Sequence, residues 1–521
     1  MEAIAALIAQ AGVDGRRLRT VLAYLNDGRW WTLADLVRES ATSRRTVESL
    51  LREVELERSG DRFRLREPLT GLVGGRIAPA DPVAHLLPGH PGLLARMEEL
   101  VAKAPRGRQA LDHVAATADT VVRRALLLDA RFWLDGARLL CVGDHDLTSL
   151  ATAMLHPGVE VTVVDIDERI LAYIDEEAGR SGLNVRTRWA DLRLGLPAAA
   201  QSWADLAVTD PPYTPEGIGL FTARAAEGLR DRERGRILLA YGASERTPAL
   251  ALKVQHTLSQ LNLVNEAIYP DFNRYHGAEA IGSAADLYIL RPTTKTWPAV
   301  AARVDGFGAA IYTHGPQSVE SAAPASPTAA AAGQSTDTDA PDVLVGEWPK
   351  DLLAKTPRAR LTTWLAKPYA SDPARVAIAV PAGLEAALPR LLLATRAQHV
   401  HVTLAGPPQD LPTGPLSAVY GLTTRGATIH AVRLPLPSTD SGRILRRILD
   451  TAHSKLANTW REALIRARGD LTKKQARALI TGVAPWADDV TVLELPAHRL
   501  EQLPDAVAAS LTAADAAGSP G

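Results

Sequence analysis

Cysteine is almost absent from this chain of 521 residues, in which Cys141 is the only one. A single cysteine excludes an intramolecular disulfide and any zinc or iron–sulfur site built on several thiolates, and it suits a reducing cytoplasm. No apolar run is long enough to span a bilayer, and the N-terminus carries no basic leader with a cleavage site. We therefore expect a cytoplasmic protein with neither membrane insertion nor export.

Net charge is also nearly absent, since 58 basic and 59 acidic residues leave a formal charge of −1. This balance excludes a chain-wide attraction to nucleic acid but leaves room for a local basic patch. At roughly 150 residues per domain, the length predicts about three domains. We expect a winged-helix-like domain (1–68), a helical connector (69–120), an α/β catalytic domain (121–295), a disordered linker rich in Ala, Pro, Ser and Thr (296–342), a second α/β domain of unknown role (343–510) and a disordered tail (511–521).

The first 68 residues have the pattern of three helices followed by a hairpin. Thr32 and Ser43 stand where the second and third helices should be capped, and Gly60-Asp61 divides two alternating strands. One interpretation is DNA binding, through Arg44, Arg45 and Arg52. The alternative is a packing or dimerisation module of the same shape, and we favour it because glutamates interleave with those arginines and would weaken contacts with phosphate.

The segment 343–510 predicts strands at 376–380, 399–404 and 428–434 and one long helix at 442–468 with a basic face. A solvated helix face is a better explanation of these charges than an anionic partner. His399 and His401 alternate on a strand, but the sequence supplies no further ligands beside them, and we expect no metal site.

The central part of the chain alternates strands and helices. Strands are predicted within 138–146, 160–167, 184–191, 205–209 and 236–241, with short connections between them. This alternation predicts an α/β fold with a parallel, doubly wound sheet of Rossmann type, similar to that of methyltransferases.

Aspartates stand at the ends of successive strands of this sheet. The first turn, Gly143-Asp144-His145-Asp146, keeps one glycine and places two carboxylates where a diphosphate-binding loop would have further glycines. A diphosphate would be repelled there and a cation attracted. Taken singly, each aspartate is also a common helix cap. Together with Asp165, Asp167, Asp191 and Asp210, they predict a cleft for a positively charged nucleoside and an amine.

The most informative motif is Asp210-Pro211-Pro212-Tyr213, which follows the apolar run 205–209. Two prolines cannot continue a central strand, so the chain must turn at the carboxyl edge of the sheet, where such folds bind ligands. A carboxylate beside an aromatic ring predicts chemistry on an amino nitrogen.

These motifs resemble the branched-chain polyamine synthase family, also called N4-bis(aminopropyl)spermidine synthases. The resemblance covers roughly residues 1–293 and is carried by Arg123–Leu127, Gly143–Ala151, Val164–Arg169 and Asp210–Thr214. It implies transfer of aminopropyl groups from decarboxylated S-adenosylmethionine, a co-substrate with no tightly bound cofactor, to a spermidine-like polyamine. It also implies a homodimer through the N-terminal module.

Three features depart from the family pattern. His145 replaces the middle member of an acidic triplet, residues 343–510 have no counterpart, and Phe272–Glu279 matches only partly an Asn-x-x-Tyr region of the family.

The site residues follow from this chemistry and from the resemblance. Asp210 is expected to orient the attacking nitrogen and accept its proton, and Asp144 and Asp146 to hold the aminopropyl side of the donor. The donor would contact Gly143, His145, Asp165, Asp167 and Asp191, and the acceptor Pro211, Pro212, Tyr213, Glu216 and Glu279.

Two other functions stay open at this point. One is methylation of an exocyclic amine of nucleic acid with S-adenosylmethionine, in which Tyr213 would stack on a flipped base. The other is a DNA-binding regulator whose Rossmann domain senses a cationic ligand. Nucleic acid is therefore an alternative partner, although the acidic first turn disfavours a phosphate backbone.

Overall fold

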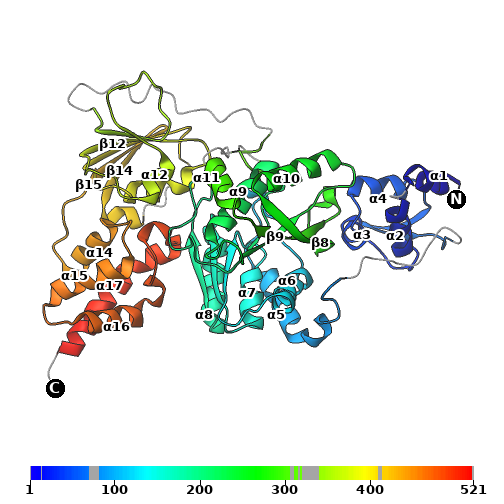
Figure 1. Cartoon of the computed structure of the whole chain (residues 1–521), viewed down its shortest axis with the longest axis horizontal. Helices are drawn as coiled ribbons and strands as arrows, with labels where there is room; N and C mark the ends of the chain where they lie inside the picture. The colour runs from blue at the N-terminus through cyan, green and yellow to red at the C-terminus, as the bar shows by residue number, and fades with distance from the viewer. Residues whose placement is uncertain are drawn as a thin grey trace. The chain divides into compact units, whose positions relative to one another are not determined.

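The computed structural model describes residues 2–12, 15–69, 81–304, 310–314, 317–319, 340–408 and 414–518 (Figure 1). The chain divides into two compact units. The first comprises Met1–Val161, Glu177–Val185 and Ala204–Gly315, and the second Thr162–Glu176, Arg186–Trp203 and Pro316–Gly521.

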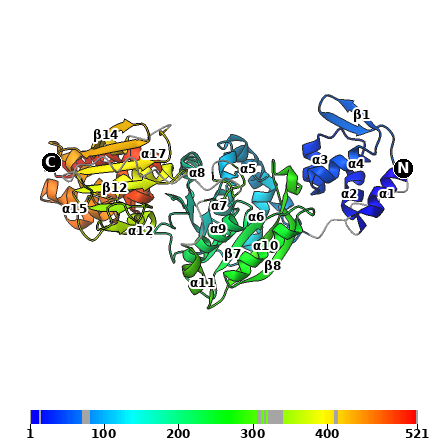
Figure 2. The same cartoon turned by 90° about the horizontal axis from the view of Figure 1, so that it is seen from above.

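The N-terminal part consists of helices and one hairpin, as the sequence predicts. Its elements are α1 (Glu2–Gln10), α2 (Gly15–Leu25), α3 (Leu33–Ser40), α4 (Arg44–Leu51), β1 (Leu56–Ser59) and β2 (Arg62–Leu65), which pairs antiparallel with β1. Their core includes Leu22, Leu36 and Leu50, which are fully buried. Figure 2 shows the hairpin beside α3 and α4. The winged-helix assignment and a DNA-binding role stay predictions.

The two expected helix caps have different outcomes. The Thr32 hydroxyl accepts a hydrogen bond from the Asp35 amide, as a cap should. The prediction for Ser43 is wrong, because its side chain makes no capping bond to α4. Its hydroxyl instead donates to Glu245 Oε1 over 2.7 Å. A contact with a distant carboxylate has replaced the local one.

A seven-stranded sheet carries the central α/β part. Its order is β5-β4-β3-β6-β7-β9-β8, and the first five positions follow the 3-2-1-4-5 order of Rossmann-like sheets. The strands are β3 (Arg138–Val142), β4 (Glu160–Asp165), β5 (Val185–Trp189), β6 (Leu206–Thr209), β7 (Arg236–Tyr241), β8 (Leu263–Arg274) and β9 (Ala284–Pro292). The helices are α5 (Pro91–Lys103), α6 (Ala118–Arg131), α7 (Thr148–Leu155), α8 (Glu168–Ser181), α9 (Pro215–Gly228), α10 (Pro248–Gln260) and α11 (Thr296–Arg303).

The sheet is mixed rather than fully parallel. Strands β3, β6 and β7 run parallel to one another, but β9 pairs antiparallel with both β7 and β8. The parallel strands are continuous apolar runs, and Leu140, Cys141 and Val142 on β3 are fully buried. This is the pattern of strands covered on both faces. The antiparallel pair β8–β9 was not anticipated from the sequence.

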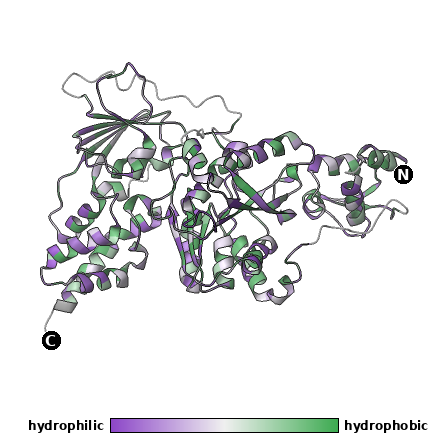
Figure 3. Cartoon of the chain, in the orientation of Figure 1, coloured by the Kyte–Doolittle hydropathy of each residue, from purple (hydrophilic) through white to green (hydrophobic). Residues whose placement is uncertain are grey.

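The second unit contains a six-stranded sheet of order β11-β10-β12-β13-β15-β14. Its strands are β10 (Val343–Val345), β11 (Arg358–Ala359), β12 (Arg375–Val380), β13 (His399–Leu404), β14 (Tyr420–Arg425) and β15 (Thr428–Arg433). Its helices are α12 (Leu361–Ala366), α13 (Leu388–Leu393), α14 (Asp440–Leu449), α15 (Leu456–Arg468), α16 (Lys473–Val483) and α17 (Ala497–Gly518). Figure 3 shows apolar and polar residues alternating along the last of these helices.

Three predicted boundaries in this region are wrong. The helix expected at 442–468 is broken between α14 and α15, where the Leu456 amide donates to the Val490 carbonyl. The tail expected from 511 is instead helical to Gly518, with Leu511 and Ala514 buried. The linker expected from 296 begins with helix α11, in which Thr296 and Val300 are buried. Most of the remaining linker, from 305 to 339, lies outside the described residues.

Candidate functional site

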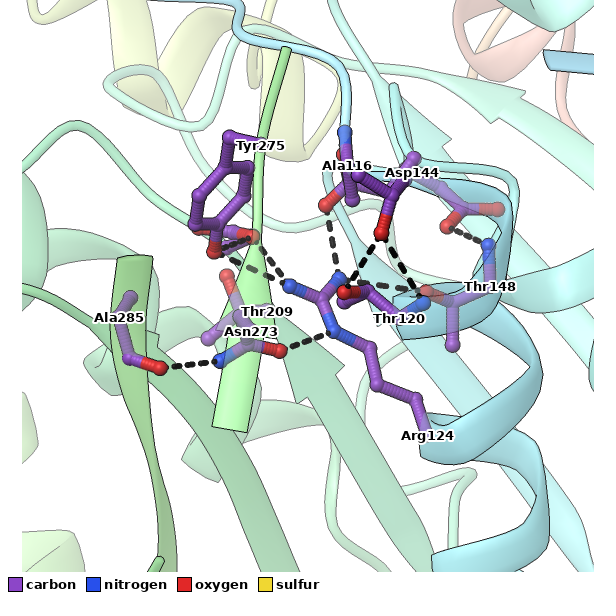
Figure 4. A network of polar contacts seen from close by, with 12 residues as sticks. Ala116, Thr120, Arg124, Asp144, Thr148, Thr209, Asn273, Tyr275 and Ala285 are labelled. Carbon is purple, nitrogen blue, oxygen red and sulfur yellow. Dashed lines mark hydrogen bonds and ion pairs between the residues drawn. The ribbon is translucent and has the colours of Figure 1, made fainter. Parts of the chain in front are cut away.

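A buried arginine joins two of the predicted aspartates. Arg124, on α6, is 2% exposed. Its guanidinium donates to Asp146 Oδ2 over 2.7 Å and to Asp210 Oδ2 over 2.6 Å. Its Nε donates to Asn273 Oδ1 over 2.8 Å (Figure 4). The planar fork of arginine can satisfy several acceptors at once, which a lysine ammonium cannot do in the same geometry.

Asp210 follows β6 at the turn that the two prolines predict. Besides Arg124, it accepts from Tyr213 OH over 3.0 Å and from Tyr275 OH over 2.7 Å. The two phenol oxygens lie 2.9 Å apart. The side chain of Asp210 is still 16% exposed, so the carboxylate is held firmly but can be reached from solvent.

Burial and neighbouring charges set the protonation of this cluster. Burial raises the pKa of Asp210 to about 6, against the opposing effect of the Arg124 charge. Burial also raises the pKa of Tyr213 and Tyr275 well above the ordinary phenol value, so both stay protonated as donors. For Arg124, Asp146 and Asp210 outweigh the effect of burial and raise its pKa. Near neutral pH, Asp210 is thus mainly a carboxylate.

Asp144 and Asp146 hold the turn between β3 and α7. Asp144 accepts from the amides of Thr148 and Ser149, over 2.8 and 3.1 Å, and so caps α7. Burial raises its pKa to about 7. Asp146 Oδ1 accepts from the Ala116 amide over 2.9 Å. The helix-cap interpretation therefore describes Asp144, whereas Asp146 belongs to the Arg124 cluster.

The aspartates that follow β4 and β5 lie in segments that belong to the second unit. Asp165 accepts from the Asp167 amide over 2.8 Å. Both oxygens of Asp167 contact Arg169, and both oxygens of Asp191 contact Arg193, with the shortest distance 2.6 Å in each pair. Asp167 and Asp191 thus already have arginine partners two residues along the chain.

The other predicted residues are placed as follows. Gly143 has a φ of +73°, a backbone conformation that favours glycine, at the end of β3. His145 stacks on His113 with the ring centres 4.5 Å apart. Pro211 and Pro212 are buried, while Glu216 is exposed in the first turn of α9.

Glu279 does not join the cluster around Asp210. It pairs with Arg44 over 2.7 Å, and Arg44 also contacts Glu48. Arg44 was the first of the arginines considered for DNA binding. Two carboxylates now neutralise it, which weakens that interpretation.

Sequence reasoning assigned no role to Arg124, Asn273 or Tyr275. Arg124 appeared only within a resembling segment, and Asn273 and Tyr275 only within a partial match. A usable signal existed: clustered carboxylates need a cation, and Arg124 is a charged residue on a helix whose neighbours Ala125 and Leu126 are apolar and buried.

Within the described ranges, no group of three or more His, Cys, Asp or Glu side chains is arranged to hold a metal ion. No helix in the described part of the chain is both long and apolar enough to cross a membrane.

Comparison with known proteins agrees with the motifs. Residues 92–305 match the family described as the branched-chain polyamine synthase A C-terminal domain. This match confirms the predicted resemblance for that part of the chain.

Curated relatives match over a similar length. An uncharacterised protein of Methanocaldococcus jannaschii is 38% identical over 174 residues, or 33% of this chain and 43% of the relative. An N(4)-bis(aminopropyl)spermidine synthase of the same organism is 30% identical over 193 residues, or 36% of this chain and 54% of the relative. The chain spans about half the length of the curated relatives it matches.

Among solved structures, the branched-chain polyamine synthase from Thermus thermophilus, in complex with N4-aminopropylspermidine and 5'-methylthioadenosine, is 21% identical. The alignment covers 56% of this chain and 92% of that one, with a TM-score of 0.42.

Proposed function

We propose that this protein transfers aminopropyl groups from decarboxylated S-adenosylmethionine to an amine of a spermidine-like polyamine. The observation that carries the proposal is the Asp210 carboxylate, which is held at a strand end by Arg124, Tyr213 and Tyr275 and is still partly exposed. The match of residues 92–305 to the polyamine synthase family and the name of the second relative support the same reaction.

The proposed reaction is a displacement at carbon. The lone pair of the attacking nitrogen forms a bond to the methylene carbon next to the sulfonium. The carbon–sulfur bond breaks, and its electron pair returns to sulfur, which leaves as a neutral thioether. The attacking nitrogen must be uncharged, so its proton has to leave before or during the attack.

Asp210 suits the role of proton acceptor. With a pKa of about 6, its carboxylate is mainly ionised near pH 7 and can still take a proton. Tyr213 and Tyr275 donate to it and fix its orientation. Tyr213 donates to this carboxylate, and in the proposal its ring would pack along the amine or contact an ammonium group.

The donor side of the proposal rests on the strand-end residues. Gly143 and His145 would border the donor, Asp165 would accept from ribose hydroxyls, and Asp191 would accept from the adenine amino group. For Asp191, this requires a carboxylate oxygen to accept from the ligand as well as from Arg193. Asp144 and Asp146 would act on the aminopropyl ammonium through the negative charge of the first turn.

The proposal keeps fewer residues for binding the acceptor amine than the sequence alone predicts. Tyr213 and the two prolines stay in the proposal, and exposed Glu216 stays as a contact for a distal ammonium. Glu279 would have to leave Arg44 to take part. A homodimer, which the resemblance implies, and a cytoplasmic location, which the single cysteine suits, also remain proposals.

Product analysis separates the three functions. The protein is incubated with decarboxylated or intact S-adenosylmethionine, with spermidine or DNA, and the products are identified by mass spectrometry. We expect spermidine to gain aminopropyl groups and 5'-methylthioadenosine to accumulate. Methylated DNA would instead establish the methyltransferase, and ligand binding without turnover the regulator.

Asp210→Asn tests the residue that carries the proposal. An amide can accept a hydrogen bond but cannot take the proton, so we expect a loss on the order of 10²-fold or more. Asp231→Asn, in the turn before β7, is the control, since Asp231 accepts from the amides of Glu233 and Arg234 in its own turn and lies 3.9 Å from the Arg234 guanidinium. Full activity of Asp210→Asn would remove Asp210 from this role.

A further inference from the structure

The second α/β domain contacts the turn that carries Asp191. Arg193 Nη2 donates to the Gly383 carbonyl over 2.8 Å, and Gly383 lies in the loop that follows β12. All three residues belong to the second unit. The side chains of Asp191 and Arg193 are only 2% and 5% exposed, so water hardly competes for these bonds. A buried and satisfied polar contact of this kind makes the local structure rigid.

Arg193 joins two acceptors that come from distant parts of the sequence. Its Nε and Nη2 donate to the two oxygens of Asp191, over 2.8 and 2.6 Å. The Nη2 group carries two hydrogens, so it can donate to Asp191 and to Gly383 at the same time. The guanidinium is planar and holds these directions in one plane. The position of the Asp191 carboxylate is therefore tied to the loop at Gly383.

The loop that contains Gly383 is itself held in place. Gly383 has a φ of +77°, a backbone conformation that favours glycine. Gln317 Nε2 donates to the Ala382 carbonyl over 2.8 Å. The Gln317 side chain packs so closely on Gly383 that a Cβ at this position would overlap its amide. The carbonyl that accepts from Arg193 is thus fixed both by the backbone and by a neighbouring side chain.

The same domain also contacts the turn after β4. Glu168, the first residue of α8, follows Asp167 directly. Its carboxylate accepts from Arg390 Nη2 over 2.6 Å and from the Ala497 amide over 2.7 Å. Arg390 is buried, and its guanidinium lies 4.0 Å from the ring centre of Trp189 at the end of β5. The domain therefore holds both strand ends to which the proposed function assigns the nucleoside of the donor.

We infer that the second α/β domain positions the donor nucleoside, because the Gly383 carbonyl holds Arg193 and Arg193 holds the Asp191 carboxylate that accepts from the adenine amino group. Arg193 and Gly383 act through Asp191 and are positioning residues. The inference rests on the proposed function, which assigns adenine to Asp191. It gives a role to a domain that lies outside the matched family region, residues 92–305.

Nucleoside selectivity tests this link without relying on turnover. 5'-Methylthioadenosine and 5'-methylthioinosine, in which a carbonyl replaces the 6-amino group, are titrated into the full-length protein by calorimetry. A fixed carboxylate accepts from the amino group and repels the carbonyl oxygen, so we expect the adenine nucleoside to bind about tenfold more tightly or better. Gly383→Ala should reduce this ratio about tenfold. Alanine disfavours a φ of +77°, and its methyl group would displace Gln317, so the loop shifts away from Arg193.

Two further variants sharpen the test. Arg193→Lys keeps a positive charge beside Asp191 but lacks the planar fork that joins it to Gly383. The ratio should fall in this variant too, which keeps the inference testable if Gly383→Ala does not fold. Gly469→Ala is the matched control, since Gly469 lies in the same domain with a φ of +75°, and an added Cβ there has no neighbouring group within 4 Å. It should lose a similar amount of thermal stability and keep the ratio unchanged.

The outcomes are distinct. An unaltered ratio in folded Gly383→Ala overturns the inference, and so does an equal fall in Gly469→Ala. Where Gly383→Ala does not fold, an unaltered ratio in Arg193→Lys overturns it. Equal binding of the two nucleosides by the unaltered protein overturns it as well.

Failure of the proposed function gives a different result. If the ratio falls as expected but spermidine gains no aminopropyl group, the proposed reaction is overturned and the positioning of the nucleoside stands. If the unaltered protein binds neither nucleoside, both the inference and the donor part of the proposed function are overturned.

Discussion

Replacing Arg124 is the most informative perturbation of the site. Arg124 is fully enclosed and stands between Asp146 and Asp210 at 2.7 and 2.6 Å. Arg124→Met removes the cation and leaves two carboxylates facing each other. Breaking a buried ion pair in this way typically costs about 3–5 kcal/mol. We expect a loss of this size in the free energy of local opening of α6, measured by hydrogen exchange.

The same substitution should shift the titration of Asp210. An opposite charge in direct contact lowers a carboxyl pKa by about 1–3 units, equivalent to about 1.4–4 kcal/mol. Without Arg124, the pKa of Asp210 should therefore rise from about 6 to about 7 or higher. Since the carboxylate is the active form, activity is lost as pH falls through this value, and the acid limb of the pH–rate profile should move to higher pH.

Two comparisons make this prediction refutable. Arg123 precedes Arg124 and pairs with Asp81 and Asp119, so Arg123→Met removes a similar ion pair outside the cluster. It should leave the acid limb in place. Carbon-13 titration of labelled aspartate follows the pKa of Asp210 even without turnover. An unchanged pKa of Asp210 in Arg124→Met would refute the electrostatic reasoning, whatever happens to stability.

Other substitutions probe separate contacts. Tyr275→Phe removes a donor to Asp210 and should raise the pKa of that carboxyl by on the order of 1 unit, visible in the same pH–rate profile. Burial raises the pKa of Asp144. The contribution of this carboxyl to stability is therefore present at pH values below its ordinary pKa and is lost as pH rises through about 7. Asp144→Asn should abolish this pH dependence of stability, which hydrogen exchange of the α7 amides measures. Glu245→Gln should weaken the contact with Ser43 and increase hydrogen exchange in α4, whereas unchanged exchange would show that this contact is dispensable.

Local features of the fold were predictable because they are written in short stretches of sequence. Strands β3, β4, β6 and β7 are apolar runs bounded by polar turns, and the Thr32 cap needs only a residue three positions away. The turn at Asp210 follows from two prolines that cannot continue a strand.

Contacts between residues that lie far apart in the sequence were not predictable in the same way. The sequence pattern offers Ser43 the amides of the following helix as partners, and only the folded chain brings Glu245 Oε1 to 2.7 Å from its hydroxyl. The antiparallel strands β8 and β9 form by pairing across the sheet, β9 with β7 and β8 with β9, and this pairing matters more than local propensity.

The sequence by itself determined which groups can do chemistry: aspartates at strand ends, an aromatic ring after two prolines, and no thiolate cluster. Only the tertiary structure decided how those charges are compensated. It brings Arg124 from α6, and Asn273 and Tyr275 from the region of β8, onto Asp146 and Asp210. Carboxylates gathered in a buried place need a cation near them, and the residue that provides it can lie anywhere in the sequence.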